Sequence, residues 1–242
     1  MCQELILSWQ DTKTDQWFPI GRFSKHNDAY TFIYTKGAKQ AKKHGFIELA
    51  SMSDFNAEYR YSDIFPLLKN RILNKSRPDR QEFLKWLNID SSNTDFEELA
   101  KTGGVKATDN LCLFPMPIKK NNQYNLEFFT QGIGHLTKSS QKRIEALEVG
   151  EKLFFCADLE NSQDKNASMF RTKDPVEIAG YCPKYFAKDF KKLFNLSKES
   201  FSIKVKQVNK NAPEQLRLLC EITCDWHQDF SPFAEDKFTS IN

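Results

Sequence analysis

The sequence lacks the long apolar runs that mark membrane proteins. None of its windows reaches the roughly 18 apolar residues that a spanning helix needs. The N-terminus, MCQELILSWQD, has no basic segment followed by an apolar run, so we expect no signal peptide. With 40% apolar and 28% charged residues, the composition is typical of soluble proteins, and we expect a cytoplasmic location.

Paired cysteines are absent as well. The six cysteines stand at 2, 112, 156, 182, 220 and 224, without a C-x-x-C pair. This spacing favours neither zinc nor a secreted disulfide framework, so reduced thiols are expected. Cys220, Cys224 and His227 suggest a metal site, but alternation from Leu216 to Trp226 puts both cysteines on the apolar face of a strand and His227 on the other. We therefore predict buried thiols, with no metal and no cofactor.

Catalytic motifs are missing too. The four histidines, at 26, 44, 135 and 227, are scattered, and the chain has no nucleophile elbow, paired metal motif or Gly-rich phosphate loop. The sequence thus predicts a binding protein without catalytic residues rather than an enzyme. A net charge of +3 does not by itself demand a nucleic-acid partner.

Periodicity in the first half predicts strands and helices in alternation. Strands are expected at 5–9, 17–23 and 30–34, followed by a helix at 36–43. Further helices are expected at 64–72, after Pro78 and after Thr94; Ser62 is the expected N-cap of the first, and Gly103 and Gly104 end the last.

The second half is richer in short strands. These are expected at 124–130, 153–155, 167–171, 176–181, 201–206 and 216–226, with helices beginning at Ser139 or Ser140 and over 185–194. Short apolar runs separated by turn residues are typical of small β-barrels. We therefore predict an α+β fold, with an α/β module at 1–105, a connector at 106–122 and a barrel with short packed helices at 123–242.

The centre of this second half resembles a known family. The order E-x-G-E-x-L, D-x-E-N-x-x-D-x-N-A and I-x-G-Y-x-P-K is similar to the HIRAN domain, a small β-barrel found in DNA-repair ATPases and as a free-standing bacterial module. The resemblance extends from Gly132 to about Phe233. The matching residues are Gly150, Asp158, Asn161, Asp164, Asn166, Ala167, Gly180, Tyr181 and Pro183.

This resemblance implies a pocket for a DNA 3′ end. Family members with that activity tend to carry an Arg and then an aromatic residue where this chain has Gly134 and His135, and an aromatic residue where it has Gln163. The first difference removes a charge that could hold a phosphate. His135 is a candidate ligand contact, although a lone histidine near a turn is also typical of a surface or capping residue. Asp164 and Asn166 either contact a ligand or fix a tight loop through backbone hydrogen bonds.

Aromatic and basic residues follow the G-Y-x-P turn. Tyr181, Lys184, Tyr185 and Lys188 combine rings for stacking with charges for phosphate, as single-stranded nucleic-acid sites do. A solvated amphipathic helix explains the lysines equally well. With Gly134, His135, Gln163 and Asp164, these four residues form the predicted DNA site.

The first half resembles a second family. The segments W-x-P-I-G-R-F, Y-T-F-x-Y and S-D-I-F-P-L-L-x-N-R-I look like the small N-terminal subdomain of HipA-type toxin kinases. The matching residues are Gly21, Tyr30, Phe32, Tyr34, Tyr61, Phe65, Pro66 and Arg71. The kinase core itself is absent, so the resemblance implies an interaction module. The basic run RILNKSRPDR offers Arg71, Lys75, Arg77 and Arg80 as partner contacts, although cations near a helix C-terminus also stabilise its dipole.

Two functions follow from these patterns. The first is a non-enzymatic DNA-binding protein that recognises single strands or DNA ends through the barrel, while the N-terminal module recruits a protein such as a defence nuclease or helicase. The second is an antitoxin-like accessory subunit of a HipA-type kinase without a DNA role. Family context associates these functions with phage defence, toxin–antitoxin systems or DNA repair.

Overall fold

The computed structural model describes residues 4–26, 29–90, 95–161, 164 and 166–241. The chain packs as two compact units, one of Met1–Leu84, Ile89–Met116 and Phe233–Asn242, the other of Lys85–Asn88 and Pro117–Pro232. Residues 106–116 of the expected connector and the C-terminal segment thus both pack in the first unit. The fold mixes strands and helices in both units, which confirms the predicted α+β class.

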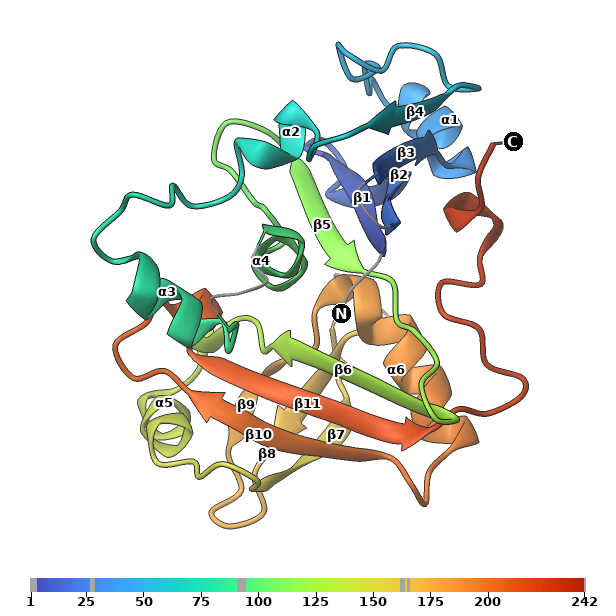
Figure 1. The fold of residues 1–242 in the computed structure, drawn as a ribbon. Coiled ribbons are helices and arrows are strands. Elements are labelled where there is room, and N and C mark those ends of the chain that lie inside the picture. Colours follow the sequence, from blue (N-terminus) through green and yellow to red (C-terminus); the bar gives the residue numbers. More distant parts are fainter. Residues whose placement is uncertain (1–3, 27–28, 91–94, 162–163, 165, 242) are drawn as a thin grey trace. The chain divides into compact units, whose positions relative to one another are not determined.

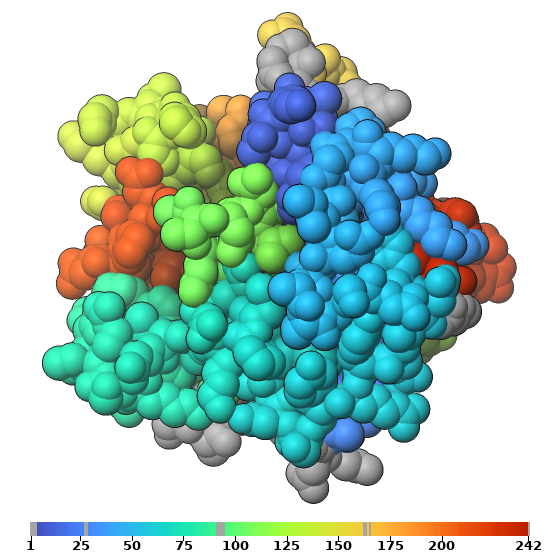
Figure 2. Space-filling model, turned by 90° about the horizontal axis from the view of Figure 1, so that it is seen from above, coloured from blue at the N-terminus to red at the C-terminus, as the bar shows by residue number. Residues whose placement is uncertain are grey.

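The first unit is built on an antiparallel sheet in the order β4-β3-β2-β1-β5 (Figure 1). Its strands are β1 Glu4–Asp11, β2 Gln16–His26, β3 Ala29–Tyr34, β4 Glu58–Tyr61 and β5 Leu111–Pro115. The helices are α1 Lys36–Lys42, α2 Pro66–Lys69, α4 Asp95–Thr102 and the short η3 Asp236–Phe238, and α3 Arg80–Trp86 begins here. Figure 2 shows the segment between α1 and α3, in light blue to turquoise, forming a continuous surface on one face of this unit.

Aromatic side chains fill the core of this sheet. Phe32 lies 4.6 Å from Phe23 and 4.9 Å from Tyr34 between ring centroids, and all three are buried. The Tyr34 hydroxyl donates to the Met52 carbonyl at 2.7 Å, so the polar end of a buried ring is satisfied. The three strands predicted here from apolar and aromatic runs are confirmed.

The expected helix at 64–72 is much shorter than predicted. Helix α2 covers only Pro66–Lys69, and its N-cap is Phe65 rather than Ser62. Beyond Asn70 the backbone amides of Arg71 and Ile72 bond three residues back instead of four, so the helix does not propagate. The proposed cap at Thr94 lies outside the described residues, while Gly103 and Gly104 follow α4 with positive φ, as expected of helix-ending glycines.

The second unit is a strongly bent sheet in the order β6-β11-β10-β7-β8-β9, in which all neighbouring strands are antiparallel (Figure 1). Its strands are β6 Gln123–Phe129, β7 Lys152–Ala157, β8 Ser168–Arg171, β9 Ile178–Tyr181, β10 Ser202–Val208 and β11 Leu218–Asp225. Its helices are η1 Ile133–His135, α5 Lys138–Glu145, α6 Lys184–Leu196 and η2 Glu214–Leu216. The strands predicted for this half are confirmed with small shifts at their ends.

A pair of hydrogen bonds joins the two edge strands of this sheet at one end. Gln131, just after β6, donates from its amide to the Tyr181 carbonyl at 2.9 Å, and Tyr181 donates back to the Gln131 carbonyl at 2.8 Å. Since β6 and β9 are the outermost strands, this exchange curls the sheet toward a barrel. Gln131 and Tyr181 are fifty positions apart in the printed sequence, so the closure is a tertiary feature.

The interior confirms the predicted thiol burial. Cys220 and Cys224 lie with Ile222 on the inner face of β11 and are almost fully buried. Burial raises the pKa of the Cys224 thiol to about 11, so the metal-free thiol is protonated at neutral pH. Within the described ranges, no three His, Cys, Asp or Glu side chains gather as a metal site would require. In the same part of the chain, no helix combines the length and apolar character needed to cross a bilayer.

Candidate functional site

The closure between Gln131 and Tyr181 positions the predicted His135 turn. Gly132 adopts a left-handed backbone with φ of 72°, which reverses the chain into the single turn of η1. A β-carbon on Gly132 would lie 3.3 Å from the Tyr181 ring, so the turn rests directly against that aromatic side chain. The structure therefore brings His135, which is exposed, to the same end of the barrel as Tyr181.

Helix α5 supports this turn from behind. The Gln141 amide nitrogen donates to the carbonyls of Ile133 at 3.3 Å and Leu136 at 3.0 Å. The expected caps Ser139 and Ser140 are not the N-cap of α5; Thr137 is, because its hydroxyl accepts from the Ser140 amide at 3.2 Å. The Ser140 hydroxyl is thereby free to donate to Glu177 at 2.6 Å, which ties the helix to the chain entering β9.

Gly180 explains how the chain reaches Tyr181. Its φ of 117° lies in a region open to glycine, and a β-carbon would meet the Thr130 side chain at 2.7 Å. The glycine thus allows β9 to approach the residues after β6 closely enough for the Gln131–Tyr181 exchange. The G-Y pair of the sequence motif is therefore part of barrel closure.

A carboxylate lies beside Gly134, in the space that an arginine side chain would take under the resemblance described above. A β-carbon on Gly134 would sit 2.0 Å from the Glu214 Oε2 atom and 2.7 Å from Cδ. Glu214 begins η2 in the connection between β10 and β11, eighty positions further along the chain. The space over Gly134 is therefore filled by a negative group, and sequence reasoning missed it because no local pattern links the two positions.

The Asp164 loop is held by its own short polar side chains. The Asp164 carboxylate accepts from the Asn166 amide at 2.9 Å, and the Asp164 amide donates to the Asn161 side chain at 2.9 Å. The chain that leaves this loop borders the site, since the Cys182 amide donates to the Ser168 carbonyl at 2.8 Å. Burial raises the pKa of the Cys182 thiol, and the Asp164 carboxylate raises it further. These bonds fit the loop-fixing interpretation of Asp164. Gln163 lies outside the described residues.

Helix α6 places the lysines beside this site. Lys184 is its first residue, three positions after Tyr181, and both Lys184 and Lys188 are exposed. The first turn contains no acidic side chain, and Pro183 provides no side-chain cap, so no residue of this first turn opposes the positive end of the helix dipole. Tyr185 is half-buried, with its ring centroid 4.6 Å from that of Phe186.

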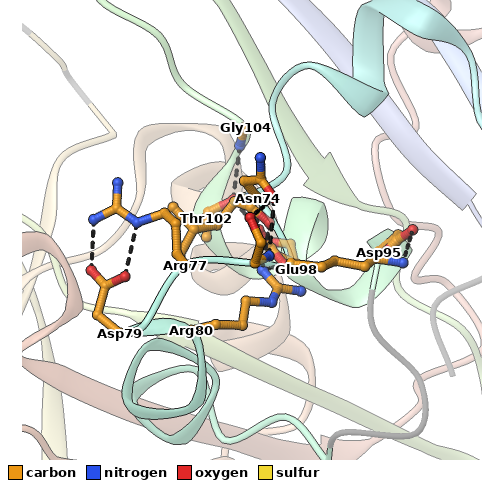
Figure 3. Close-up of polar contacts among 11 residues, drawn as sticks. Asn74, Arg77, Asp79, Arg80, Asp95, Glu98, Thr102 and Gly104 are labelled. Atoms are coloured by element: carbon orange, nitrogen blue, oxygen red, sulfur yellow. Dashed lines mark hydrogen bonds and ion pairs between the residues drawn. The ribbon is translucent and has the colours of Figure 1, made fainter.

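The basic run of the first unit is largely engaged in ion pairs. Arg71 donates to the Gly104 carbonyl at 2.7 Å and to Asp109 at 2.5 Å, and its side chain is only 2% exposed. Arg80 pairs with Glu98 at 2.6 Å, and both side chains are buried (Figure 3). Arg71 and Arg80 therefore face the interior of the first unit rather than a partner surface.

The other two cations of this run remain on the surface. Lys75 lies 3.2 Å from Asp95. Arg77 makes two bonds to Asp79, as Figure 3 shows. Both side chains are more than half exposed. Only these two members of the predicted partner-binding set are accessible.

Comparison with protein families matches residues 100–227 to the HIRAN domain, a little more than half of the chain. The chain belongs to the HIRAN domain family. The matched region begins before the first predicted residue of the resemblance and includes the closure, the His135 turn and most of the barrel. The family match does not confirm the HipA-like resemblance of the first half, which stays a prediction.

Two solved structures show a distant likeness to part of this chain. The HIRAN domain of human HLTF is 17% identical, covers 41% of this chain and 74% of its own, and has a TM-score of 0.32. A protein from Lactobacillus plantarum is 14% identical, covers 42% of this chain and 96% of its own, and has a TM-score of 0.33. A comparison with curated proteins gave no match.

Proposed function

We propose that the HIRAN region of this chain binds single-stranded DNA, with a strand end seated at the barrel closure, and that it does so without catalysis. Family membership supports DNA binding. The proposed position of the DNA site rests on the pair of hydrogen bonds between Gln131 and Tyr181. This pair brings the His135 turn, the Tyr181 ring and the start of α6 together at one end of the barrel.

Each part of this end has a suitable chemistry. The Tyr181 ring offers a stacking surface for a base, and His135 is exposed next to it. Lys184 and Lys188, on the uncapped positive end of α6, attract the phosphates of the adjoining nucleotides. Asp164 acts mainly by holding the loop that borders Tyr181.

The Glu214 carboxylate favours a DNA strand whose 3′ end carries no phosphate. A terminal phosphate placed over Gly134 would meet the Glu214 carboxylate, whereas a 3′-hydroxyl can donate a hydrogen bond to it. We therefore expect a free 3′-hydroxyl to be preferred to a 3′-phosphate.

Fluorescence anisotropy tests this function. Oligonucleotides that end in a 3′-hydroxyl or a 3′-phosphate are titrated at low and moderate salt, with the first expected to bind more tightly and both to weaken with salt. Equal binding would contradict recognition of the end, and no binding at low salt would exclude the function.

Matched charge variants locate the site. Lys184→Gln should weaken binding several-fold and flatten the salt dependence by about 0.7 in slope, the value for one lost single-strand phosphate contact. Lys198→Gln, which removes an exposed lysine just beyond the other end of α6, should change neither quantity. The same response from both variants would mean diffuse charge attraction rather than a site.

We propose as a second function that the first unit recruits a protein partner, such as a HipA-type kinase or a defence nuclease or helicase. The exposure of Lys75 and Arg77 supports this role. Co-expression with a neighbouring kinase gene product and co-purification test it, with Lys75→Gln/Arg77→Gln as the variant expected to lose the partner. A retained complex would exclude this surface.

A further inference from the structure

The outer face of β7, β8 and β9 carries a continuous row of paired side chains. Residues directly opposite in an antiparallel sheet project to the same face, and here Lys204 faces Lys152, Phe154 faces Arg171 and Cys156 faces Met169. Met169 in turn faces Tyr181. Leu153 and Phe170, which alternate with these residues, are buried in the barrel core, so the row lies on the outside.

Phe154 is the centre of this row. Its ring lies 4.8 Å from the Arg171 guanidinium carbon and 5.7 Å from the Lys152 ammonium nitrogen. Phe154 and Arg171 are half-buried, and Lys152 is exposed. A partly exposed ring flanked by two cations offers a base a stacking surface and offers its phosphates two positive charges.

The charge of the outer face changes across the sheet. Lys204 has Lys152 on one side and Glu221 on the other, and Glu221 in turn faces Glu127 on β6. Lys206 already pairs with both of these carboxylates, at 3.3 and 3.4 Å. An anionic ligand is therefore favoured over β7, β8 and β9, toward Tyr181, and disfavoured over β11 and β6.

We propose that this row, defined as Lys152, Phe154, Arg171, Met169 and Tyr181, is a track for the single strand that continues from the end bound at the closure. The inference rests on the proposed function and extends it. Phe154 and Tyr181 are separated by two strand spacings and two residues along a strand, or about 12 Å. A strand held at Tyr181 therefore needs only a few further nucleotides to reach Phe154.

Length dependence tests the track. Oligo-dT of two and twelve nucleotides, each with a free 3′-hydroxyl, are titrated against the wild type and Phe154→Leu. The dinucleotide is too short to reach Phe154 from Tyr181, so loss of one stacking contact should weaken binding of the 12-mer about tenfold and barely affect the dinucleotide. Lys152→Gln should lower the salt slope of the 12-mer by about 0.7, and Lys198→Gln should leave it unchanged.

Cys156 offers a readout that needs no substitution in the track. It is half-exposed between Phe154 and the Met169–Tyr181 pair, whereas the other described cysteines are buried. Alkylation followed by mass spectrometry should show Cys156 protected by the 12-mer and less protected by the dinucleotide.

The outcomes separate the track from the end site. If both oligonucleotides bind equally well and Cys156 stays reactive, the track is wrong while the end site stands. A length preference that survives Phe154→Leu also overturns the track. Absence of binding to either oligonucleotide by the wild type overturns the proposed function and the track together.

Discussion

Two groups of basic residues in this chain differ in what surrounds their charges. In the first unit, each of Arg71, Lys75, Arg77 and Arg80 has a carboxylate within 3.2 Å. In the HIRAN region, Lys152 and Arg171 lie against an aromatic ring. A cation that is already paired within the protein has less to offer a ligand, so the partners of a basic residue, rather than its place in a basic run, indicate where an anion would bind.

The largest expected effect is a loss of unfolding free energy when the buried Arg80–Glu98 ion pair of the first unit is broken. Arg80→Met leaves the Glu98 carboxylate buried without its cation, and such a change costs about 3–5 kcal/mol of unfolding free energy. Burial already raises the pKa of the Glu98 carboxyl, against the hydrogen bonds from Leu73 and Arg80, which shows that this charge depends on its partners. Urea unfolding measures the loss.

Two further variants control this prediction. Arg77→Gln removes an exposed cation from the same run, so it should change the unfolding free energy far less than Arg80→Met does. The double variant Arg80→Met/Glu98→Leu should recover much of the stability, because no unpaired charge remains. Equal losses from Arg77→Gln and Arg80→Met would show that burial does not distinguish the two pairs.

A smaller loss of unfolding free energy is expected for a substitution at the barrel closure of the HIRAN region. Gly180→Ala must strain a backbone at φ of 117° and also displace Thr130, so we expect a loss of about 2–4 kcal/mol. Gly150→Ala shares the first cost, with φ of 87°, but has nothing within 4 Å of the new methyl group, and should lose about 1–2 kcal/mol. Similar losses in thermal unfolding would mean that close approach to Thr130 is not required.

Local patterns in the sequence predicted the elements better than the contacts between them. Alternation from Leu216 to Trp226 correctly placed Cys220 and Cys224 on one buried face, because a strand's period is set by its own residues. The helix expected after Ser62 was too long, since apolar spacing alone does not show where hydrogen bonding switches from four residues to three.

The candidate site was predictable only in part for the same reason. The G-Y-x-P motif and the glycines around His135 were visible in the sequence. The hydrogen-bonded pair of Gln131 and Tyr181, which brings these two segments together, is visible only in the fold. Phe154 left a usable signal, since it follows Lys152 by two positions in a strand whose intervening residue is apolar. Glu214 left none, because its approach to Gly134 depends on the barrel bringing η1 and η2 together.

Glu214→Gln should have the smallest effect and sharpens the comparison most, since it removes an anion from the ligand-binding side. At about 4 Å in water, one charge pair is worth about 1 kcal/mol, so the 3′-phosphate oligonucleotide should gain about fivefold in affinity while the 3′-hydroxyl one changes little. Anisotropy at low salt measures both, and Glu199→Gln, another exposed glutamate of the same unit, is the control. An equal gain in affinity for both oligonucleotides would mean that Glu214 repels DNA phosphates in general and does not distinguish the two strand ends. A gain confined to the phosphate would mean that this chain, which has Glu214 beside Gly134, selects its strand end by repelling the charged alternative.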